Sequence, residues 1–298
     1  MINGFMKVED FFDYDFKGFI LSLKLKPLGA IYDVLIRRAC SHFLMKVYRC
    51  DNLPSWLSLF RSLTKNNKFL LVVLDGARFD AFRALYARFL RGELCTARVP
   101  PPHTYGWLPR AFSVPEFDNV RVFYARLAIK SHDIMIEKLV PRHKKVELIS
   151  IVPKRAKKLG TVLPSEVNEK VLKVGLSGRD IIWYSQPHFP WIYNYELSKI
   201  LVREVLLHDF FPPDIIADKL KKLSVRRKFL VNAYYGNLIL ALKHVSDLLN
   251  HIKGMSIKYD ELVITSDHGE LLGEYGLYLH QDYNLPQLVV VPWFRVKL

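Results

Sequence analysis

Residues 261–281 read ELVITSDHGELLGEYGLYLHQ, and the rest of the chain is best understood as a scaffold around this stretch. Residues 262–264 form a short apolar, β-branched run, which is typical of a buried strand. A polar cluster that contains Asp267 and His268 follows directly. In an open α/β sheet, residues just past the carboxyl end of a strand lie at the crevice where ligands bind. A carboxylate and an imidazole at that position form half of a candidate metal site.

A simpler interpretation of the same stretch stays open at this point. A surface loop with a helix-capping aspartate and an isolated histidine gives the same letters, and short motifs occur by chance. Gly273 and Gly276 allow the chain to turn back before His280. The other segments of the chain must therefore decide between a metal site and a plain loop.

Length, composition and charge set the broad class of the protein. A chain of 298 residues, half of them apolar, can build one large α/β domain or two small ones with a sizeable core. The formal net charge of +15 attracts anions, whether phosphorylated or sulfated substrates, nucleic acid or an acidic membrane surface. The charge indicates only the sign of the partner.

Cysteine usage and the N-terminus bear on the compartment. The three cysteines, Cys40, Cys50 and Cys95, show no CxxC spacing, which indicates a reduced compartment without a disulfide framework or a cysteine-rich zinc finger. No window of 18 or more uninterrupted apolar residues occurs, so a transmembrane helix is not expected. The first residues lack a signal-peptide layout. A cytoplasmic location is therefore predicted.

Residues 1–67 are predicted to form a helical segment packed on a catalytic domain of residues 68–298. Apolar residues recur at every fourth position from Ile31 to Val47, which marks one face of a helix, and residues 55–63 suit another helix. Basic residues surround the first apolar face, and a basic amphipathic helix can also lie on an anionic bilayer as a peripheral contact. Packing on the sheet is the preferred interpretation.

A second strand end carries an acidic residue. Residues 69–74, FLLVVL, suit a central strand buried on both faces, and they end at Asp75. Residues 81–90 have good helix propensity, so the strand–turn–helix order places Asp75 at the carboxyl edge of the sheet. The alternative makes Asp75 a helix cap. Asp80 is interpreted as an ion-pair partner of Arg78 or Arg83.

A threonine lies in the proline-rich turn that residues 99–107, VPPPHTYGW, are expected to form. A helix is predicted over residues 105–112, so Thr104 would lie near a helix N-terminus, where free N–H groups favour negative charge. Thr104 is therefore either a helix cap or a nucleophile.

Alternating strands and helices predict a mostly parallel sheet covered on both faces. His188 follows one of the strands, and a last strand at residues 288–294 contains Pro292, which indicates a strand end or a position toward an edge. Further strands are predicted at residues 120–128, 146–152 and 180–185, and helices at 131–140 and 165–174.

A long helical region with a break at residues 211–213 is expected over residues 195–253. It contains a basic run between Lys219 and Lys228, which is interpreted as a solvated face. Because no aromatic residue is interleaved within that run, nucleic-acid binding is not expected.

The order and kind of these segments resemble a known family. Residues 265–280, TSDHGELLGEYGLYLH, are similar to the metal motif of the alkaline phosphatase superfamily, in its sulfatase and phosphoethanolamine transferase branch. LDGARFDAF at 74–82, PPHTYGW at 101–107 and YSQPHFPW at 184–191 resemble further segments of that family in the same order. The resemblance implies a three-layer α/β/α sandwich with a mostly parallel central sheet.

Carried over residue by residue, the resemblance implies that Asp75, Thr104, Asp267 and His268 bind a divalent metal. Carboxylate and imidazole ligands favour Zn²⁺, while Mg²⁺, Mn²⁺ or Ca²⁺ would depend more on the carboxylates. A metal-activated Thr104 would attack the ester and form a covalent phospho- or sulfo-threonine. The histidines and aspartate of a second metal site are not evident, so a second metal is left open.

Two further pairs of residues follow from the same resemblance. His188 and His280 match positions near the substrate, and either imidazole could protonate the leaving oxygen. Arg78 or Arg110 is predicted to contact the anionic group of the substrate.

Departures from the family pattern shape the functional prediction. Cys95 lies in CTARVP, which lacks the CxPxR pattern that becomes formylglycine in sulfatases, and the first ligand is Asp75 where the transferases have a glutamate. Their block of membrane helices is also missing from the sequence. We therefore predict a metal-dependent hydrolase or transferase of phosphate esters on a small anionic, sugar, lipid-linked or nucleotide substrate. The alternatives are a sulfatase that works without formylglycine, and a binding protein of the same fold without turnover.

Overall fold

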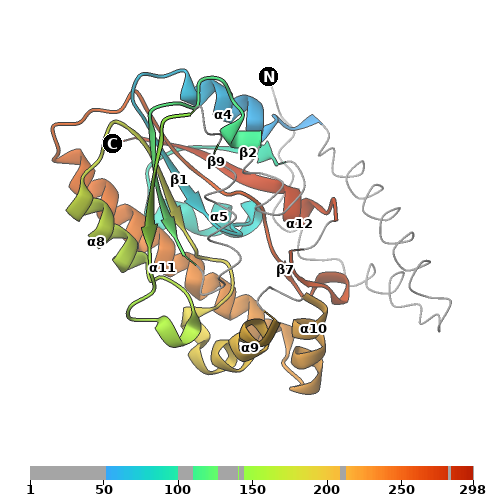
Figure 1. Cartoon of the computed structure of the whole chain (residues 1–298). Coiled ribbons are helices and arrows are strands. Elements are labelled where there is room, and N and C mark those ends of the chain that lie inside the picture. Colours follow the sequence, from blue (N-terminus) through green and yellow to red (C-terminus); the bar gives the residue numbers. More distant parts are fainter. Residues whose placement is uncertain are drawn as a thin grey trace.

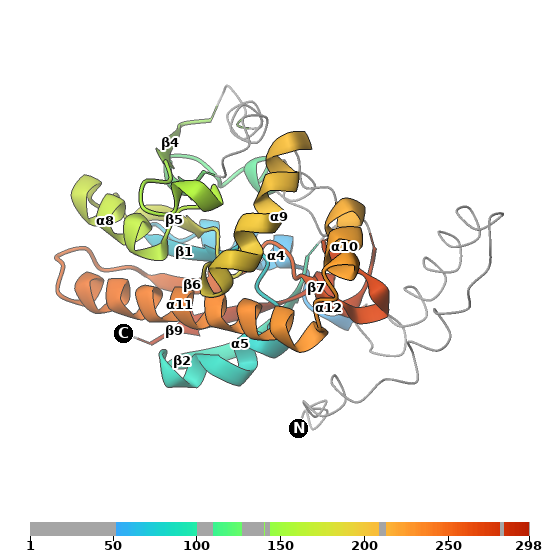
Figure 2. The same ribbon diagram turned by 90° about the horizontal axis from the view of Figure 1, so that it is seen from below.

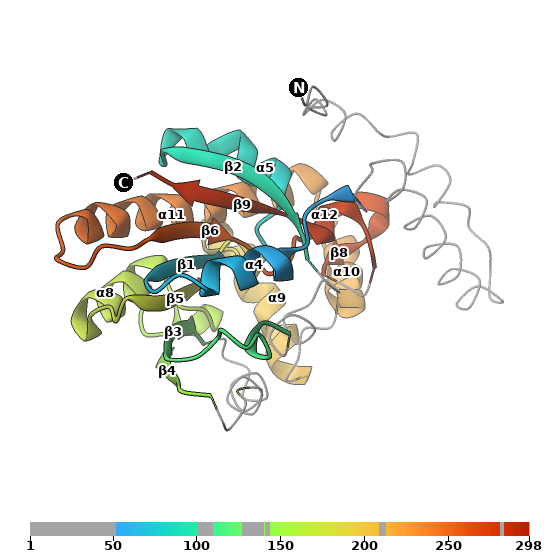
Figure 3. The ribbon, with the colours of Figure 1, turned by 90° about the horizontal axis from the view of Figure 1, so that it is seen from above.

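The computed structural model describes residues 52–99, 110–126, 140, 144–208, 213–280 and 283–297. Within these residues, one seven-stranded sheet has the strand order β2-β9-β6-β1-β5-β3-β4. Figure 3 shows the sheet with these strands side by side. The strands are β1 (Phe69–Leu74), β2 (Gly92–Arg98), β3 (Val120–Ala125), β4 (Val146–Ile151), β5 (Arg179–Tyr184), β6 (Glu261–Thr265) and β9 (Val290–Val296).

The sheet is mostly parallel, as the alternation of strands and helices predicts. Strand β1 pairs in parallel with β5 on one side and β6 on the other, and β3 pairs in parallel with β5 and β4. Strand β9 runs antiparallel to β6, and β2 runs antiparallel to β9. All six residues of β1 are buried, because a central parallel strand is covered on both faces.

Helices cover both faces of the sheet, so the three-layer α/β/α fold predicted from the sequence is confirmed (Figure 1). Alternate residues of β1 belong to two separate cores: Leu70, Val72 and Leu74 face one, and the residues between them face the other. The first core is closed by α5 (Phe79–Leu85), α8 (Pro164–Val174) and α11 (Arg227–Lys253), and the second by α4 (Trp56–Thr64) and α12 (Pro286–Val289).

The helical region between β5 and β6 contains three helices. Among the described residues they are α9 (Tyr195–His208), α10 (Pro213–Lys222) and α11, and most of the break predicted at residues 211–213 lies outside the described residues. Helix α11 packs across α8 and α5, as the view from below shows (Figure 2). Among the helices of the described residues, none combines the length and the apolar character that a membrane span requires.

Three details differ from the sequence predictions. The edge strand β2 is not predicted, since its residues, GELCTAR, show no long apolar run. The last strand begins at Val290 rather than at residue 288, because the short helix α12 precedes it. Pro292 does not lie at an edge, since β9 pairs with strands on both sides. It lies just beyond the last β6–β9 residue pair, Thr265 with Trp293, so that ladder does not need its missing N–H.

The N-terminal predictions are only partly covered by the described residues. The helix predicted at residues 55–63 is α4, and its Trp56 and Phe60 are buried in the second core. The helix predicted between Ile31 and Val47 lies outside the described residues, as does nearly all of the helix predicted at 131–140. The proposed boundary between residues 67 and 68 remains a prediction.

Candidate metal centre

The carboxyl ends of β1, β5 and β6 are fastened to one another by backbone and side-chain hydrogen bonds. The Asp75 N–H donates to the Tyr184 carbonyl (3.0 Å), and the His188 N–H donates to the Asp75 carbonyl (2.9 Å). These two bonds hold the residues after β1 against the residues after β5. The strand-end position predicted for Asp75 and for His188 is therefore also the place where the two backbones meet.

Ser266 and Asp267 join the end of β6 to the turn after β1. The Ala77 N–H donates to Ser266 Oγ (2.8 Å), and this hydroxyl lies within 2.6 Å of the Leu74 carbonyl oxygen. The Gly76 N–H donates to Asp267 Oδ1 (3.3 Å). Gly76 has a φ of +70°, in the left-handed region that glycine adopts without strain. The turn after β1 is thus shaped to meet the DHG segment.

Gly269 lies against the backbone of the segment before β9. A Cβ atom at this position would lie 1.9 Å from the Gln287 carbonyl oxygen, far inside van der Waals contact. The Gly269 N–H donates to the Leu288 carbonyl (2.7 Å). Only glycine permits this approach, which fixes the backbone directly after His268.

Asp75, Asp267 and His268 form a buried cluster in which one ligand atom from each lies within 4.8 Å of the others. His268 Nε2 lies 3.4 Å from Asp267 Oδ2 and 3.6 Å from Asp75 Oδ1. His268 Nδ1 lies 2.8 Å from the Gly269 carbonyl oxygen, to which it donates, so the neutral ring directs the lone pair of Nε2 toward the two carboxylates. A donated Nδ1–H of this kind is the usual way in which a metal-binding histidine is oriented.

Two atoms of this cluster lack a hydrogen-bond partner although both are buried. They are His268 Nε2 and Asp75 Oδ1. Buried polar atoms normally have a partner, and unpartnered acceptors that face one another repel. A divalent cation between these acceptors would satisfy both, and the donor set of two carboxylates and one imidazole fits such an ion.

The electrostatics of the cluster favour the binding of a cation. Burial raises the pKa of Asp75 well above its usual range, the negative charges of Asp267 and Glu270 raise it further, and a hydrogen bond from Trp183 opposes the change. Burial likewise raises the pKa of Glu270 well above its usual value. The fold therefore gathers acidic groups where their charges are costly unless a cation balances them.

Glu270 is an acidic residue of this region that the site prediction left out. Its side chain is fully buried, and a Cβ on Gly76 would lie 3.3 Å from Glu270 Oε2. The sequence signal was the fourth letter of DHGE, which directly precedes two leucines. A glutamate before apolar residues is usually a surface residue, so its complete burial could not be predicted from the letters alone.

The structure brings His188 and His280 together beside His268. His188 Nε2 lies 3.2 Å from His280 Nδ1, and the ring centroids of His268 and His280 are 4.2 Å apart. His188 Nδ1 also contacts the Phe189 carbonyl oxygen. Since a carbonyl can only accept, His188 donates from Nδ1, and in its neutral form its Nε2 accepts from His280 Nδ1–H. This tautomer leaves the Nε2 atom of a neutral His280 as an acceptor.

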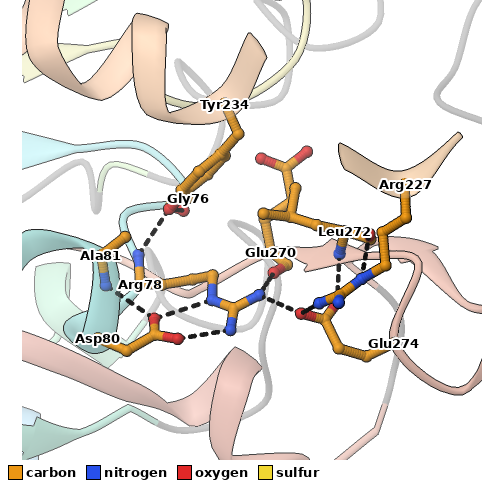
Figure 4. A network of polar contacts seen from close by, with 9 residues as sticks. All are labelled: Gly76, Arg78, Asp80, Ala81, Arg227, Tyr234, Glu270, Leu272 and Glu274. Carbon is orange, nitrogen blue, oxygen red and sulfur yellow. Dashed lines mark hydrogen bonds and ion pairs between the residues drawn. The ribbon is translucent and has the colours of Figure 1, made fainter. Parts of the chain in front are cut away.

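Arg78 is held by internal partners. Its guanidinium donates to both carboxylate oxygens of Asp80, with Nε–Oδ1 at 2.9 Å and Nη2–Oδ2 at 2.6 Å. It also donates to Glu274 Oε1 (2.7 Å) and to the Glu270 carbonyl (3.3 Å), as Figure 4 shows. The expected ion pair between Asp80 and Arg78 is thus present. These contacts give Arg78 a structural role next to the site, and substrate contact by Arg78 remains a prediction.

Glu274 connects this network to α11. Its Oε1 accepts from Arg78 and from Arg227 Nη2 (2.8 Å), and its Oε2 accepts from the Leu272 N–H (2.5 Å). Burial alone would raise the pKa of Glu274, but the charges and hydrogen bonds of Arg78 and Arg227 lower it to about 2. Glu274 lies in the turn that connects β7 (Leu271–Leu272) to β8 (Tyr278–Leu279), so the network holds the hairpin that leads to His280.

Two predicted site residues are not placed in the cluster. Thr104 and the start of the helix predicted at 105–112 lie outside the described residues. Arg110 lies within the described residues and is exposed, and its carbonyl accepts a hydrogen bond from the Ser113 hydroxyl (2.9 Å). Within the described contacts, none joins Arg110 to the strand-end cluster. The roles of both residues remain predictions.

Comparison with known proteins identifies the fold. No protein-family model matches this chain, and no curated protein matches it in sequence. Among solved structures, a 2-O GAG sulfatase is similar with a TM-score of 0.52 and 13% identity, covering 78% of this chain and 64% of the sulfatase. The chain has the alkaline phosphatase-like fold. The resemblance to the sulfatase and phosphoethanolamine transferase branch is confirmed at the level of the fold.

Two transferase domains are also similar in structure. The soluble domain of lipooligosaccharide phosphoethanolamine transferase A from Neisseria meningitidis gives a TM-score of 0.47 at 18% identity, covering 76% of this chain and 75% of that domain. The C-terminal periplasmic domain of EcEptC from Escherichia coli, in complex with Zn, gives 0.47 at 11% identity, covering 78% and 73%.

The predicted cytoplasmic location is wrong by this comparison. The similar E. coli domain is periplasmic, and so is a similar domain of the phosphoethanolamine transferase EptC from Campylobacter jejuni. The prediction relied on an odd number of cysteines and on the first residues of the chain. Cysteine usage is not decisive, because a sheet covered on both faces buries enough apolar surface for the protein to be stable without disulfides.

Proposed function

We propose that this protein is a metal-dependent enzyme that transfers or hydrolyses phosphate esters. One observation carries the proposal: Asp75, Asp267 and His268 converge with their ligand atoms within 4.8 Å, and two of those atoms are buried without a hydrogen-bond partner. The fold of the chain supports it, since similar structures include a sulfatase and phosphoethanolamine transferase domains. Zn²⁺ is the ion that we expect, because an imidazole and carboxylates suit it, and one similar domain was solved with Zn.

In this proposal the metal-binding residues and Thr104 have different roles in the reaction. Asp75, Asp267 and His268 hold the cation, and its chemistry when bound is to lower the pKa of a coordinated hydroxyl and to neutralise charge on the ester. Thr104 is the nucleophile: its oxygen forms a bond to phosphorus while the bond from phosphorus to the leaving oxygen breaks. Water or an acceptor hydroxyl then releases the group from Thr104.

The paired histidines supply the proton for the leaving oxygen. His188 and His280 share a hydrogen bond at 3.2 Å, and His188 is fixed by the Phe189 carbonyl. Fixing one ring aligns the other, so His280 can present Nε2 at the rim of the cluster. When His280 is protonated, Nε2 donates to the leaving oxygen. His280 is therefore the proton donor that we favour, with His188 as the residue that orients it.

A sulfatase reaction is the second candidate, because the structure with the TM-score of 0.52 is a sulfatase. The sequence around Cys95 weighs against a formylglycine enzyme. Cys95 lies in the middle of the edge strand β2, and its segment CTARVP lacks the CxPxR pattern. A sulfatase reaction here would therefore need Thr104 as its nucleophile.

A substrate panel tests the proposed function. The full chain would be loaded with Zn²⁺, Mg²⁺, Mn²⁺ or Ca²⁺ and assayed on phosphate monoesters, phosphate diesters and sulfate esters with one common leaving group. We expect metal-dependent turnover of phosphate esters that Asp267→Asn abolishes. Faster turnover of sulfate esters would favour the second candidate. A folded, metal-loaded protein that turns over no ester would favour a binding protein and overturn the proposal.

A further inference from the structure

A basic corner, which we define as residues 221–229, joins the end of α10 to the start of α11. Its sequence KKLSVRRKF contains five basic residues and no acidic one. Every residue of the basic corner is exposed except Val225, which is half-buried. A group of exposed basic side chains attracts anionic partners.

Two large apolar side chains stand exposed among these charges. Leu223 is 42% exposed and Phe229 is 44% exposed. The charged groups of Arg226 and Lys228 lie 5.3 Å and 5.6 Å from the centre of the Phe229 ring. A merely solvated charged surface does not need such residues, whereas a surface that binds at a membrane interface combines apolar side chains with Lys and Arg.

The backbone of the basic corner keeps these apolar side chains outside the core. Leu220 and Leu230, which flank the corner, are buried at 1% and 0% exposure. The Leu223 N–H donates to the Lys219 carbonyl (2.9 Å), and the Val225 N–H donates to the Leu220 carbonyl (3.1 Å), which closes the end of α10. Anchored on both sides, the corner presents Leu223 and Phe229 to solvent as a fixed feature.

The basic corner lies next to the hairpin that leads to His280. Arg227 donates from Nε to the Leu272 carbonyl (3.1 Å) and from Nη2 to Glu274 Oε1 (2.8 Å). Helix α10 also contacts β8, and the ends of α10 and α11 lie near β7 in Figure 2. Any large partner that covers the basic corner therefore comes to lie beside this rim of the sheet.

We propose that the basic corner docks on an anionic phospholipid bilayer. Phe229 and Leu223 enter the boundary between headgroups and acyl chains, and the other four basic side chains lie among the lipid phosphates while Arg227 holds the hairpin. The exposed leucine favours a bilayer over a nucleic acid, because it offers nothing to a phosphate backbone or a base edge. The proposal does not depend on the proposed function, since binding to lipid requires neither metal nor turnover.

Vesicle co-sedimentation of the full chain tests this proposal. Vesicles of phosphatidylcholine alone would be compared with vesicles that also contain phosphatidylglycerol, at low and high salt. We expect binding only to the anionic vesicles, with a loss at high salt. Lys222→Glu combined with Lys228→Glu should lower the partition coefficient by roughly tenfold or more. Phe229→Ser should lower it severalfold while the salt dependence persists.

A matched control separates the basic corner from net charge. Lys253→Glu combined with Lys258→Glu makes the same charge change near the other end of α11, which is about 40 Å away for a helix of 27 residues. This control should bind anionic vesicles nearly as well as the wild type. Circular dichroism and thermal melting would establish that each variant is folded.

Several results would overturn the proposal. One is equal loss of binding in the corner variant and in the matched control, which would assign the effect to net charge. Another is unchanged binding of the corner variant, which would place the contact elsewhere in the chain. A third is a wild-type protein that binds no vesicle but binds duplex DNA through Lys222 and Lys228, which would make the corner a nucleic-acid surface.

Discussion

His268 Nε2 lies 3.4 Å from Asp267 Oδ2, and both side chains are completely buried. Because His268 donates from Nδ1 to the Gly269 carbonyl, the neutral form of its ring presents Nε2 to Asp267 as an acceptor. The fold holds two acceptors face to face through the hydrogen bonds of Ser266 and Gly76. A divalent cation bound by both atoms would explain this arrangement.

The first prediction concerns metal binding. Asp267→Asn should abolish binding of the ion, because the amide has nearly the shape of the carboxylate but no charge. We expect about one equivalent of Zn²⁺ per wild-type chain by elemental analysis. Zn²⁺ at 100 times its dissociation constant should stabilise the wild type by about 2.7 kcal/mol and leave the variant unchanged.

Asp247→Asn is the control for this prediction, since Asp247 is an exposed aspartate of α11. It should retain both the metal and the thermal shift. Stoichiometric metal in Asp267→Asn would show that the ion is held by other residues.

The second prediction concerns Thr104. Thr104→Ala should lower kcat for phosphate esters by several orders of magnitude. The variant should still bind metal through Asp75, Asp267 and His268. Thr104→Ser should keep measurable turnover because it keeps the hydroxyl. Rapid-quench analysis should find phosphate covalently bound in the wild type only. If Thr104→Ala turns over substrate at the wild-type rate, the nucleophile lies elsewhere.

The third prediction separates the two histidines by leaving group. Loss of a general acid slows the reaction by about 10²–10⁴-fold when the leaving group is poor. We therefore expect His280→Gln to lower kcat strongly for an alkyl phosphate and weakly for p-nitrophenyl phosphate, which leaves without a proton. His188→Gln should give the same pattern with a smaller loss. An equal loss on both esters would indicate a role in folding or in binding instead.

Much of the candidate site was predictable, because residues that follow parallel strands lie together at one edge of the sheet. The apolar run of β1 is followed at once by Asp75, and the apolar run of β6 is followed by Asp267 after two polar residues. The strand, its end and the candidate ligand can therefore each be predicted from the sequence. His188 could be placed in the same way, from the strand β5 before it.

The rest depended on contacts between segments that are distant in sequence. The ion pair of Arg78 with Asp80 was expected, but the sequence does not show that Arg78 also pairs with Glu274, because that pairing joins residues 196 positions apart. Strand β2 was not predicted, because this edge strand lacks the apolar run of a central strand. The burial of Glu270 was not predicted, because it depends on which segments pack around this side chain in the fold.

The fourth prediction concerns the glycine of the DHG segment. Gly269→Ala should destabilise the protein by more than about 2 kcal/mol, because its Cβ would overlap the Gln287 carbonyl oxygen at 1.9 Å and force backbone to move. Since His268 precedes this residue, metal binding should weaken as well. Chemical denaturation and metal titration measure the two effects.

Gly254→Ala is the matched control, because a Cβ at Gly254 would make an ordinary contact of 3.5 Å with the His251 carbonyl oxygen. It should leave stability within about 1 kcal/mol of the wild type and metal affinity unchanged. Equal stability of the two variants would mean that the backbone around Gly269 adapts to a methyl group.

The fifth prediction concerns the acid side of the stability profile. Arg78 and Arg227 lower the pKa of Glu274 from 4.5 to about 2, despite the opposing effect of burial. A depressed acid pKa stabilises the folded state at pH values above the unfolded pKa, and this contribution is lost as the pH falls from about 4.5 to about 2. The shift corresponds to about 3 kcal/mol at neutral pH.

Glu274→Gln should therefore be less stable than the wild type by about 3 kcal/mol at pH 7, and the difference should shrink steadily below pH 4.5. Urea denaturation at a series of pH values measures it. Glu147→Gln is the control, because Glu147 pairs with Arg121 at a similar distance of 2.8 Å but is 57% exposed. An exposed pair contributes about 0–1 kcal/mol, so this control should differ little from the wild type at any pH. A Glu274→Gln deficit that stays constant down to pH 2 would show that the side chain acts through packing, and that its charge does not hold the hairpin of His280 in place.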